Sequence, residues 1–502
     1  MNEVLLGVDI GTSSTKGVIT HADGTVLASA QRQHETAFPR PGFVEHDPEG
    51  IWWKDFAEIT AELLPQADGP VVGVSVSGIG ATTLPADANG EPLRDAILYG
   101  IDTRAGREIE ELIERYGADA IVERSLMTVN HQSTGPKLMW LQRNEPEVWK
   151  RTKQLLMANS FIVQRLTGEY TLDSISASFC VPMFDPRRRE WIADWAEEIA
   201  PGLKLPRVLE PWEVAGRVNA RGAELTGLPE GIPVCAGTVD SLVESASVGV
   251  KNPGDVMLTY GTTLGIAGVV TEPTPSWKLN SVPGVFPGTY VLIGPTATSG
   301  ALTNWMRSLS GDMPFEDLIA EAVATPPGAN GLVALPYFAG ERTPIWDADA
   351  RGVIIGLTMA HTRGHLYRAM LEAVAYSARS ILDAINEAGV PMERIVAVGG
   401  GTKGGLWTQI VSDVTGMPQE LAEESMGACY GDALFAARAA GLVDDDTVWA
   451  STGETIEPNP EHREVYDRLY AIYGELYPAT KAQAHALAAL QAEQGLVPTE
   501  EA

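Results

Sequence analysis

The sequence has 502 residues, which is too long for a single hydrophobic core, so two or more domains are expected. Hydrophobic residues make up 44% and aromatic residues 7%, an ordinary globular composition that excludes a disordered or fibrous chain. The formal net charge of −30 argues against nucleic acid and anionic membranes as partners, because binding to either relies on Lys and Arg.

The first predicted element is a strand within residues 3–11, and its setting indicates where the protein works. The opening MNEVLLGVDIG carries an acidic residue near its tip and reaches a Gly-rich turn at once, unlike a signal peptide. No apolar stretch is long enough to span a bilayer. The three cysteines, Cys180, Cys235 and Cys429, are few and odd in number, which suits a reducing compartment. We therefore expect a soluble, cytoplasmic protein.

A turn crowded with hydroxyl groups follows this strand and leads into a second predicted strand. Gly11 lets the backbone approach an anion without a Cβ clash, and successive N–H groups of such a turn can be aimed at a phosphate. Thr12, Ser13 and Lys16 would face the phosphate or its metal. Asp9, at the end of the strand, could hold Mg²⁺ through water. An ordinary hairpin with an Asp turn explains this segment equally well.

The elements that follow alternate strands with helices, which indicates an α/β architecture. Residues 49–64 have the apolar spacing of a helix, and residues 71–80 are rich in β-branched residues and predict a strand. Residues 146–168 predict one or two helices that end at Gly168, a residue suited to a left-handed C-cap.

A candidate general base lies in residues 233–250, which predict a strand, a turn and a helix. Ser241 and Glu244 match the capping box S-x-x-E, so Ser241 is the predicted N-cap. Asp240 would then lie one residue outside the helix, free to point into a cleft and accept a proton from a substrate hydroxyl. A solvated Asp that only interacts with the helix dipole is the simpler alternative, and spacing alone favours it.

The pattern of the first hairpin returns roughly 250 residues later. Residues 254–270 again predict a strand, a Gly-Thr turn and a strand, with Gly261, Thr262 and Thr263 at the turn. Two such turns facing each other across a cleft could hold a polyphosphate from both sides.

This repetition predicts two domains of similar core topology, divided near the Gly/Pro-bearing segment 246–253. We expect the first domain to occupy residues 1–248 and the second residues 249–478. An Ala/Gln-rich helical tail, residues 479–502, follows and is expected to end in a frayed acidic terminus.

A third Gly-rich segment, residues 395–416, predicts a strand, a loop and a helix. Gly399, Gly401 and Gly404 satisfy G-x-G-x-x-G, and Glu423 lies about 20 residues further on, so a dinucleotide site is one interpretation. The match lies near the C-terminus, however, with little chain left to complete a dinucleotide-binding sheet. No G-x-x-x-x-G-K-[ST] occurs, which argues against a P-loop enzyme.

Two longer motifs carry a resemblance to a known family. Residues 352–372, GVIIGLTMAHTRGHLYRAMLE, fit one family signature at its fixed positions. Residues 134–144, TGPKLMWLQRN, resemble a second signature, with Lys137 and Trp140 in place and a departure at Gln132. Over nearly its whole length the chain thus resembles the FGGY family of carbohydrate kinases, in the actin-like ATPase superfamily. The resemblance implies an α/β fold of two actin-like (ribonuclease H-like) domains with a nucleotide and sugar cleft between them.

The same resemblance implies a role for each matching residue. Asp240 would be the general base, and Asp9 would lie near the Mg²⁺ ion of Mg-ATP. The ATP would contact the two turns, the Gly-rich loop and the helix after it, through Gly11, Thr12, Ser13, Lys16, Gly261, Thr262, Thr263, Gly400, Gly401, Lys403 and Gln409. The hydroxyls of the first turn would then serve the phosphates and the metal of a nucleotide.

The acceptor sugar is less well marked. The family reads its substrate partly through the segment after VSVSG, where xylulose kinases typically have Gln-Met-His, with an Asn after the catalytic Asp. This chain has Ile-Gly-Ala there and Ser241 after Asp240, which puts D-xylulose in doubt. Small residues at Gly80 and Ala81 could admit a bulkier or differently oriented substrate.

Asp102 and Arg104, in GIDTRA, could hydrogen-bond substrate hydroxyls or could pair with each other. The overall length and the sequences of the motifs favour a ketopentose kinase of the xylulose-kinase type. A kinase for ribulose, gluconate, erythritol or another sugar, sugar acid or polyol is the alternative within the family. A non-catalytic ATP-binding protein of the actin superfamily is the alternative of another class. The family suggests a homodimer.

Overall fold

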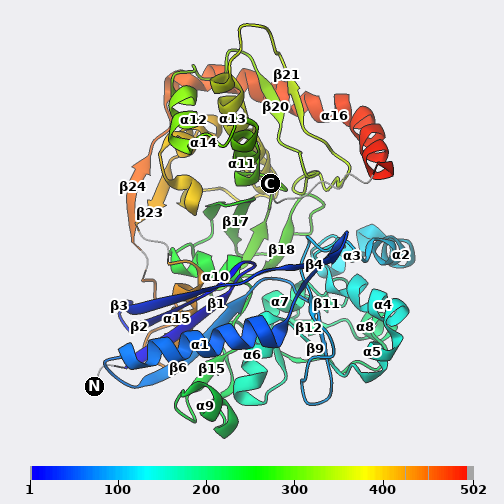
Figure 1. Ribbon diagram of the computed structural model, residues 1–502, viewed down its shortest axis with the longest axis vertical. Coiled ribbons are helices and arrows are strands. Elements are labelled where there is room, and N and C mark those ends of the chain that lie inside the picture. The colour runs from blue at the N-terminus through cyan, green and yellow to red at the C-terminus, as the bar shows by residue number, and fades with distance from the viewer. Residues whose placement is uncertain (1–2, 424–425, 450, 495–502) are drawn as a thin grey trace.

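Two β-sheets organise the computed structural model, which describes residues 3–423, 426–449 and 451–494 (Figure 1). The first sheet has the strand order β14–β15–β6–β1–β2–β3. Its strands are β1 (Val4–Ile10), β2 (Ser14–His21), β3 (Val26–Gln33), β6 (Val71–Gly78), β14 (Val214–Arg217) and β15 (Pro233–Cys235).

The second sheet, from the C-terminal half of the chain, has the order β18–β19–β17–β16–β22–β23–β24. Its strands are β16 (Asp255–Tyr260), β17 (Leu264–Val270), β18 (Asn280–Pro283), β19 (Tyr290–Ile293), β22 (Arg394–Val398), β23 (Gln419–Ala422) and β24 (Thr452–Ile456). The helices that the site depends on are α1 (Lys54–Leu63), α10 (Asp240–Ser247), α11 (Gly300–Leu309), α13 (Arg363–Glu387), α14 (Leu406–Thr415), α15 (Ala428–Ala439) and α16 (Arg463–Glu493).

The two sheets share a core arrangement. In the first, β1 and β2 form an antiparallel hairpin and β6 runs parallel to β1. In the second, β16 and β17 form the hairpin and β22 runs parallel to β16. The predicted α/β architecture and the predicted repetition of the strand–turn–strand unit are therefore confirmed. Residues 146–168 form two helices, α5 (Pro146–Arg151) and α6 (Ala158–Thr167), and Gly168 ends α6 with a left-handed φ of 82°.

Helix α15 belongs to the C-terminal half of the chain but packs on the sheet of the N-terminal half (Figure 1). The approach is close, because a Cβ added to Gly7 of β1 would lie 2.0 Å from the carbonyl oxygen of Cys429. Asp432 of α15, which is completely buried, accepts hydrogen bonds from the hydroxyl groups of Ser75 and Ser77 on β6, at 2.8 and 2.5 Å. One helix thus joins the two halves at the strands that lead to the site.

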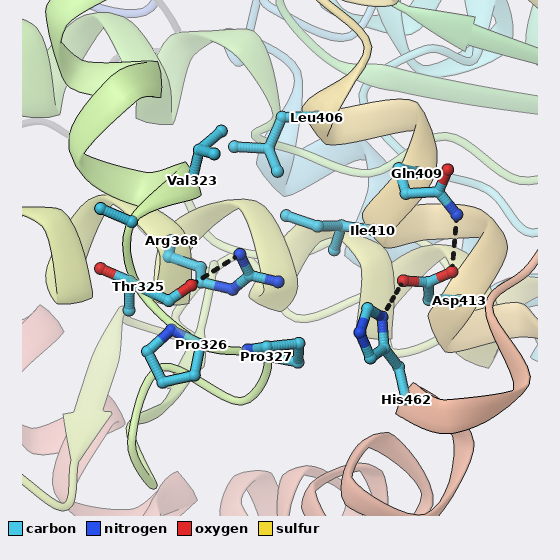
Figure 2. Close-up of a pocket in the computed structure, with 11 residues that line it drawn as sticks. Val323, Thr325, Pro326, Pro327, Arg368, Leu406, Gln409, Ile410, Asp413 and His462 are labelled. Carbon is cyan, nitrogen blue, oxygen red and sulfur yellow. Dashed lines mark hydrogen bonds and ion pairs between the residues drawn. The ribbon is translucent and has the colours of Figure 1, made fainter.

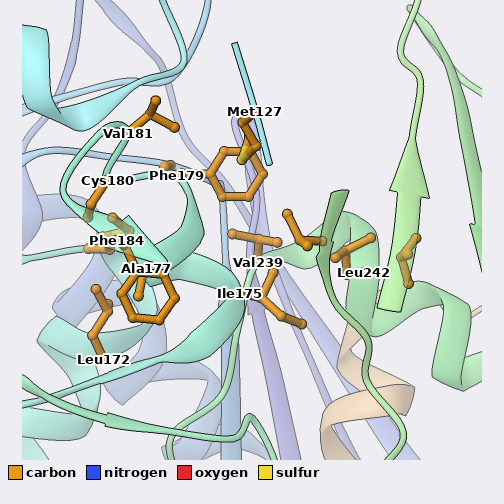
Figure 3. Packing of buried hydrophobic residues seen from close by; sticks show 14 of the residues in the cluster. Met127, Leu172, Ile175, Ala177, Phe179, Cys180, Val181, Phe184, Val239 and Leu242 are labelled. Carbon is orange, nitrogen blue, oxygen red and sulfur yellow. The ribbon is translucent and has the colours of Figure 1, made fainter. Parts of the chain in front are cut away.

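The start of α10 is fixed by a buried apolar cluster. Val239, which precedes the helix, and Leu242 in its first turn lie among Ile175 and Phe179, as Figure 3 shows. All four side chains are at least nine-tenths buried. Burial of such side chains contributes about 1.5–3 kcal/mol each. The cluster therefore holds the first residue of α10 firmly in place.

The predicted boundary after residue 478 falls inside a single helix, because α16 runs without interruption from Arg463 to Glu493 and contains Pro478. Buried side chains lie on both sides of the proline, Tyr473 and Leu476 before it and Ala484 and Ala488 after it. Tertiary packing on both flanks offsets the lost backbone hydrogen bond. The predicted frayed end, residues 495–502, lies outside the described residues. In the part of the chain described here, no helix is long and apolar enough to cross a membrane.

Candidate active site

The candidate site begins where three parallel strands of the first sheet end. β1, β6 and β15 run parallel side by side. Beyond the strand ends, the N–H of Ile79 donates to the carbonyl of Ile10 (2.8 Å), and the N–H of Gly78 donates to the carbonyl of Thr238 (3.0 Å). The segments that leave the three strands therefore stay together. Ligands of α/β sheets bind at this carboxyl edge.

Two carboxylates lie at that edge, Asp9 near the end of β1 and Asp240 after β15. Burial raises the pKa of Asp240, and the negative charge of Asp9 raises it further. The pKa of Asp9 is also raised by burial, against the lowering effects of Lys16 and of a hydrogen bond from Ser77 (3.3 Å). The structure thus brings the predicted base and the predicted metal ligand into one electrostatic unit.

Asp240 is the first residue of α10, with Val239 as the N-cap. The prediction that Ser241 caps the helix is therefore wrong by two residues, and Asp240 lies inside the helix, not one residue outside it. The N–H of Ser241 donates to Oδ1 of Asp240 at 2.6 Å. The carboxylate of Asp240 thus satisfies one of the backbone donors that the start of the helix leaves unpaired. The first turn of the helix also places positive partial charge beside the carboxylate.

Lys16 faces the same side of the hairpin as Asp9, because the two residues are directly opposite in the β1–β2 register. Its side chain is exposed. A cation at this position can attract an anionic ligand before it binds.

The donor set at the edge suits Mg²⁺. Among the described residues, no group of three or more His, Cys, Asp or Glu could hold a metal by itself. Mg²⁺ needs no such cage, since it is usually bound by one or two carboxylates together with water and substrate phosphates. The negative charge of Asp9 raises the pKa of Asp240, and a divalent cation between the two carboxylates would relieve that repulsion.

The first turn presents free backbone donors. Within the described chain, no hydrogen bond is made by the N–H of Thr12 or Ser13. Ser13 is exposed, and the hydroxyl of Thr12 lies 3.3 Å from the hydroxyl of Tyr99. The N–H of Gly11 instead closes the turn by donating to the carbonyl of Ser14 (3.0 Å). The turn has the features of an anion site, with unpaired N–H groups beside hydroxyls.

The second turn is built the same way at the edge of the second sheet. The N–H of Gly261 donates to the carbonyl of Thr263 (3.1 Å), and the start of α11 covers the turn from behind. A Cβ added to Gly300 would lie 2.6 Å from the carbonyl oxygen of Gly261. Thr262 and Thr263 are thereby held at the carboxyl end of β16.

The Gly-rich loop lies beside the second turn. A Cβ on Gly399, whose φ is 95°, would lie 2.6 Å from the carbonyl oxygen of Tyr260, and a Cβ on Gly401 would lie 2.9 Å from the Cβ of Tyr260. Only glycine fits these positions without moving the strand. Gly400 and Lys403 are exposed. The loop therefore offers an open face next to Thr262 and Thr263.

Gln409 is turned away from this loop. Its amide nitrogen donates to Asp413 (2.7 Å) and to the carbonyl of Glu457 (2.9 Å). It lines a pocket of about 340 Å³ together with Asp413, His462 and Arg368 (Figure 2). The predicted contact between the Gln409 amide group and the nucleotide is therefore not supported by the direction of the side chain, which is hydrogen-bonded within the protein.

Two of the residues predicted to contact the substrate have structural roles instead. Ala81 is completely buried in the core and presents no surface to a ligand. A Cβ on Gly80 would lie 1.9 Å from Cγ1 of Val239, so the glycine is required for the segment after β6 to pass the start of α10. The small size of these two residues lets backbone segments pack closely. It does not open room for a bulkier sugar, contrary to the expectation from the sequence.

Asp102 and Arg104 pair with each other. Arg104 donates from Nε to both oxygens of Asp102, at 2.9 and 3.0 Å, and both side chains are completely buried. Arg104 also contacts Glu45 at 2.7 Å, and Asp102 accepts the N–H of Val44 at 2.7 Å. Of the two alternatives, the structural pair is correct.

No role was predicted from the sequence for two residues near the site, Ser77 and Lys137. Ser77 links Asp9 to Asp432, and Lys137, whose pKa burial lowers to about 7, donates to the carbonyls of Leu98 and Tyr99. Lys137 was visible as a signature residue, but its role was not. Ser77 carried no signal, because a serine inside a buried strand resembles any small core residue.

Comparisons with known proteins cover nearly the whole chain. Residues 4–249 match the N-terminal domain of the FGGY family of carbohydrate kinases, and residues 256–440 match the C-terminal domain of that family. A xylulose kinase of Staphylococcus epidermidis is 29% identical over 495 residues, covering 96% of this chain and 98% of the relative.

Solved structures give the same result. The xylulose kinase from Rhodospirillum rubrum superposes with a TM-score of 0.89 at 33% identity, over 96% of this chain and 100% of that one. A gluconate kinase from Lactobacillus acidophilus superposes with a TM-score of 0.91 at 24% identity, over 97% and 100%, a likeness that shows the fold alone.

Proposed function

Because the chain belongs to the FGGY family of carbohydrate kinases, we propose that it transfers a phosphoryl group from Mg-ATP to a terminal hydroxyl of a ketopentose. It is a carbohydrate kinase with two domains of the actin-like ATPase fold. The observation that carries the finer proposal is the placement of Asp240, at the start of α10 and within the electrostatic reach of Asp9.

In the proposed reaction Asp240 is the general base. Its carboxylate accepts the proton of the acceptor hydroxyl as the hydroxyl oxygen forms a bond to the γ-phosphorus. The bond from the γ-phosphorus to the bridging oxygen breaks, and ADP leaves with that oxygen. Such transfers have a loose transition state, so the protein contributes mainly position and charge. A raised pKa suits the base, because it keeps proton affinity near neutral pH.

The phosphates would be held by the two turns. The free N–H groups of Thr12 and Ser13 on one side, and the turn at Thr262 on the other, support this assignment. Asp9 would hold the Mg²⁺ ion, which when bound neutralises charge on the transferring phosphoryl group. Lys16 lies on the same face as Asp9 and would add to the positive charge.

The acceptor is proposed to be a ketopentose of the xylulose type, since xylulose kinases match this chain over nearly its full length. We expect ATP consumption, measured across a panel of ketoses, polyols and sugar acids, to be stimulated most by a ketopentose. Mass spectrometry and ³¹P–¹³C NMR of the product should locate the phosphoryl group on a terminal carbon.

The panel also separates the alternatives. Strongest stimulation by gluconate, erythritol or another acceptor would overturn the ketopentose and keep the kinase. Tight ATP binding with no stimulation by any acceptor would favour a non-catalytic ATP-binding protein and overturn the proposed activity.

A further inference from the structure

The carbonyl groups of the first turn are held from behind by side chains that lie more than twenty residues away. His34 Nε2 lies 3.1 Å from the carbonyl oxygen of Gly11, and Thr36 Oγ1 donates to the carbonyl of Thr12 at 2.9 Å. The backbone N–H of His34 donates to the carbonyl of Ser13 at 3.0 Å. All three carbonyls at the turn are therefore engaged on one side, which leaves the N–H groups of Thr12 and Ser13 on the other.

His34 is itself clamped. Its Nδ1 lies 2.8 Å from Oδ2 of Asp55 on α1, and both side chains are at least 95% buried. Thr15 donates to the same oxygen at 3.0 Å. A carbonyl can only accept, so Nε2 carries a proton toward Gly11. The contact with Asp55 holds the opposite side of the ring and so fixes its orientation.

Thr36 is the last side chain in a series of hydrogen bonds that begins at Trp52 and ends at the carbonyl of Thr12. Trp52, completely buried, donates from Nε1 to Nδ1 of His46 at 3.1 Å. This fixes the proton of His46 on Nε2, which lies 3.0 Å from Oγ1 of Thr36. The hydroxyl proton of Thr36 is then directed to the carbonyl of Thr12. Burial, together with the charge of His34, lowers the pKa of His46 to about 4, in keeping with a neutral ring.

The carbonyl groups of the second turn are also held by hydrogen bonds from one side. There the carbonyls are held by main chain at the start of α11: Gly300 N–H donates to Gly261 (2.9 Å), and the N–H groups of Ser299 and Ala301 donate to Thr262 (3.0 and 3.1 Å). Among the described residues, no N–H from the start of a helix donates to the carbonyls of the first turn. Side chains at and after the end of β3 occupy the equivalent positions, brought there by the pairing of Ser14 with Gln33.

We propose that His34 and Thr36 are positioning residues for phosphate binding, which orient the peptide planes of the first turn so that its N–H groups face the nucleotide. The inference rests on the proposed function, since it assumes that the turn binds the phosphates of ATP. Asp55 and His46 act one step further back, by fixing the orientation of His34 and Thr36.

Thr36 offers the sharpest test, because two substitutions separate the hydroxyl from the rest of the side chain. We expect Thr36→Val to weaken ATP binding about tenfold, the loss typical of one oriented hydrogen bond, and to leave adenosine binding unchanged. Thr36→Ser should bind ATP within about twofold of the wild type, because it keeps the hydroxyl. Isothermal titration of the full-length protein with ATP and with adenosine measures both.

His34→Ala should likewise raise the Kd and the KM for ATP without raising the KM for the sugar. Arg32→Ala is the matched control near the end of β3, since the half-buried Arg32 side chain contacts Glu58, Glu62 and the carbonyl of Gln31, none of which belongs to the turn. It should match the wild type in both constants.

Three results would overturn the inference. Wild-type ATP affinity in Thr36→Val, or an equal loss of ATP and adenosine binding, would show that this series of hydrogen bonds does not position the turn. If at the same time the wild type phosphorylates a sugar, the proposed function stands and only this inference fails. A wild-type protein that binds no ATP would overturn both.

Discussion

Asp240→Ala and Asp240→Asn are expected to lower sugar-dependent turnover by about 10²–10⁴-fold, while ATP binding stays at the wild-type level. The loss follows because neither side chain can accept the proton of the acceptor hydroxyl. ATP binding should survive, since the phosphates are proposed to contact the turns and not this carboxylate. Steady-state kinetics and titration with ATP test the two parts separately.

The pH profile refines this prediction. A base must be ionised to act, so activity falls as pH drops through its pKa. Burial and the charges of Asp9 and Glu244 raise the pKa of Asp240. The acid limb of kcat/KM should therefore lie at a higher pH than the pKa of an ordinary Asp, which is about 4. Glu244→Gln is the matched control on the same helix. It should retain turnover and move the acid limb to lower pH, because one negative charge beside the base is removed. Near-wild-type turnover in Asp240→Asn would contradict the assignment.

Gly7→Ala is expected to lower the free energy of unfolding by about 3 kcal/mol, the upper part of the range for an overpacked core. The new Cβ would lie 2.0 Å from the carbonyl oxygen of Cys429 and 2.5 Å from the nitrogen of Ala433. Both are backbone atoms of α15, which cannot rotate aside, so the helix must move off the sheet. Urea unfolding measures the change.

Gly265→Ala is the matched control, a strand glycine of the second sheet with room beside it. Its added Cβ would lie 3.6 Å from the nearest atom, the Cβ of Thr259, which is an ordinary contact. The control should change the free energy of unfolding by less than about 1 kcal/mol. If Gly7→Ala were as stable as this control, the close contact between α15 and β1 would be contradicted.

Local patterns predicted the framework of the fold. The β1–β2 and β16–β17 hairpins follow from short apolar strands around Gly-Thr turns, and these are properties of a few adjacent residues. The start of α10 was predicted two residues too late, because the capping-box pattern at Ser241 and Glu244 does not reveal that the helix already begins at Asp240, whose carboxylate accepts the N–H of Ser241. The composition of the tail did not show that α16 begins before it, because packing on both flanks maintains the helix through Pro478.

The supporting residues of the site could not be predicted from local patterns. Whether Asp102 and Arg104 face a ligand or each other depends on burial, which neither residue type specifies. His34 and Thr36 reach the first turn only through the register of β3 against β2, and Asp432 reaches Ser77 only through the packing of α15 across the two halves. These contacts join residues that are distant in sequence, so a single sequence carries no direct signal for them.

The central claim is that this chain moves a phosphoryl group from ATP to a sugar with Asp240 as the base. The most direct measurement is the ratio of sugar phosphate formed to ADP released, followed with γ-labelled ATP in the wild type and in Asp240→Asn. We predict one labelled sugar phosphate for each ADP in the wild type, and almost none in the variant although it binds ATP. ADP released with the label in inorganic phosphate alone, or equal transfer by the two proteins, would contradict the account.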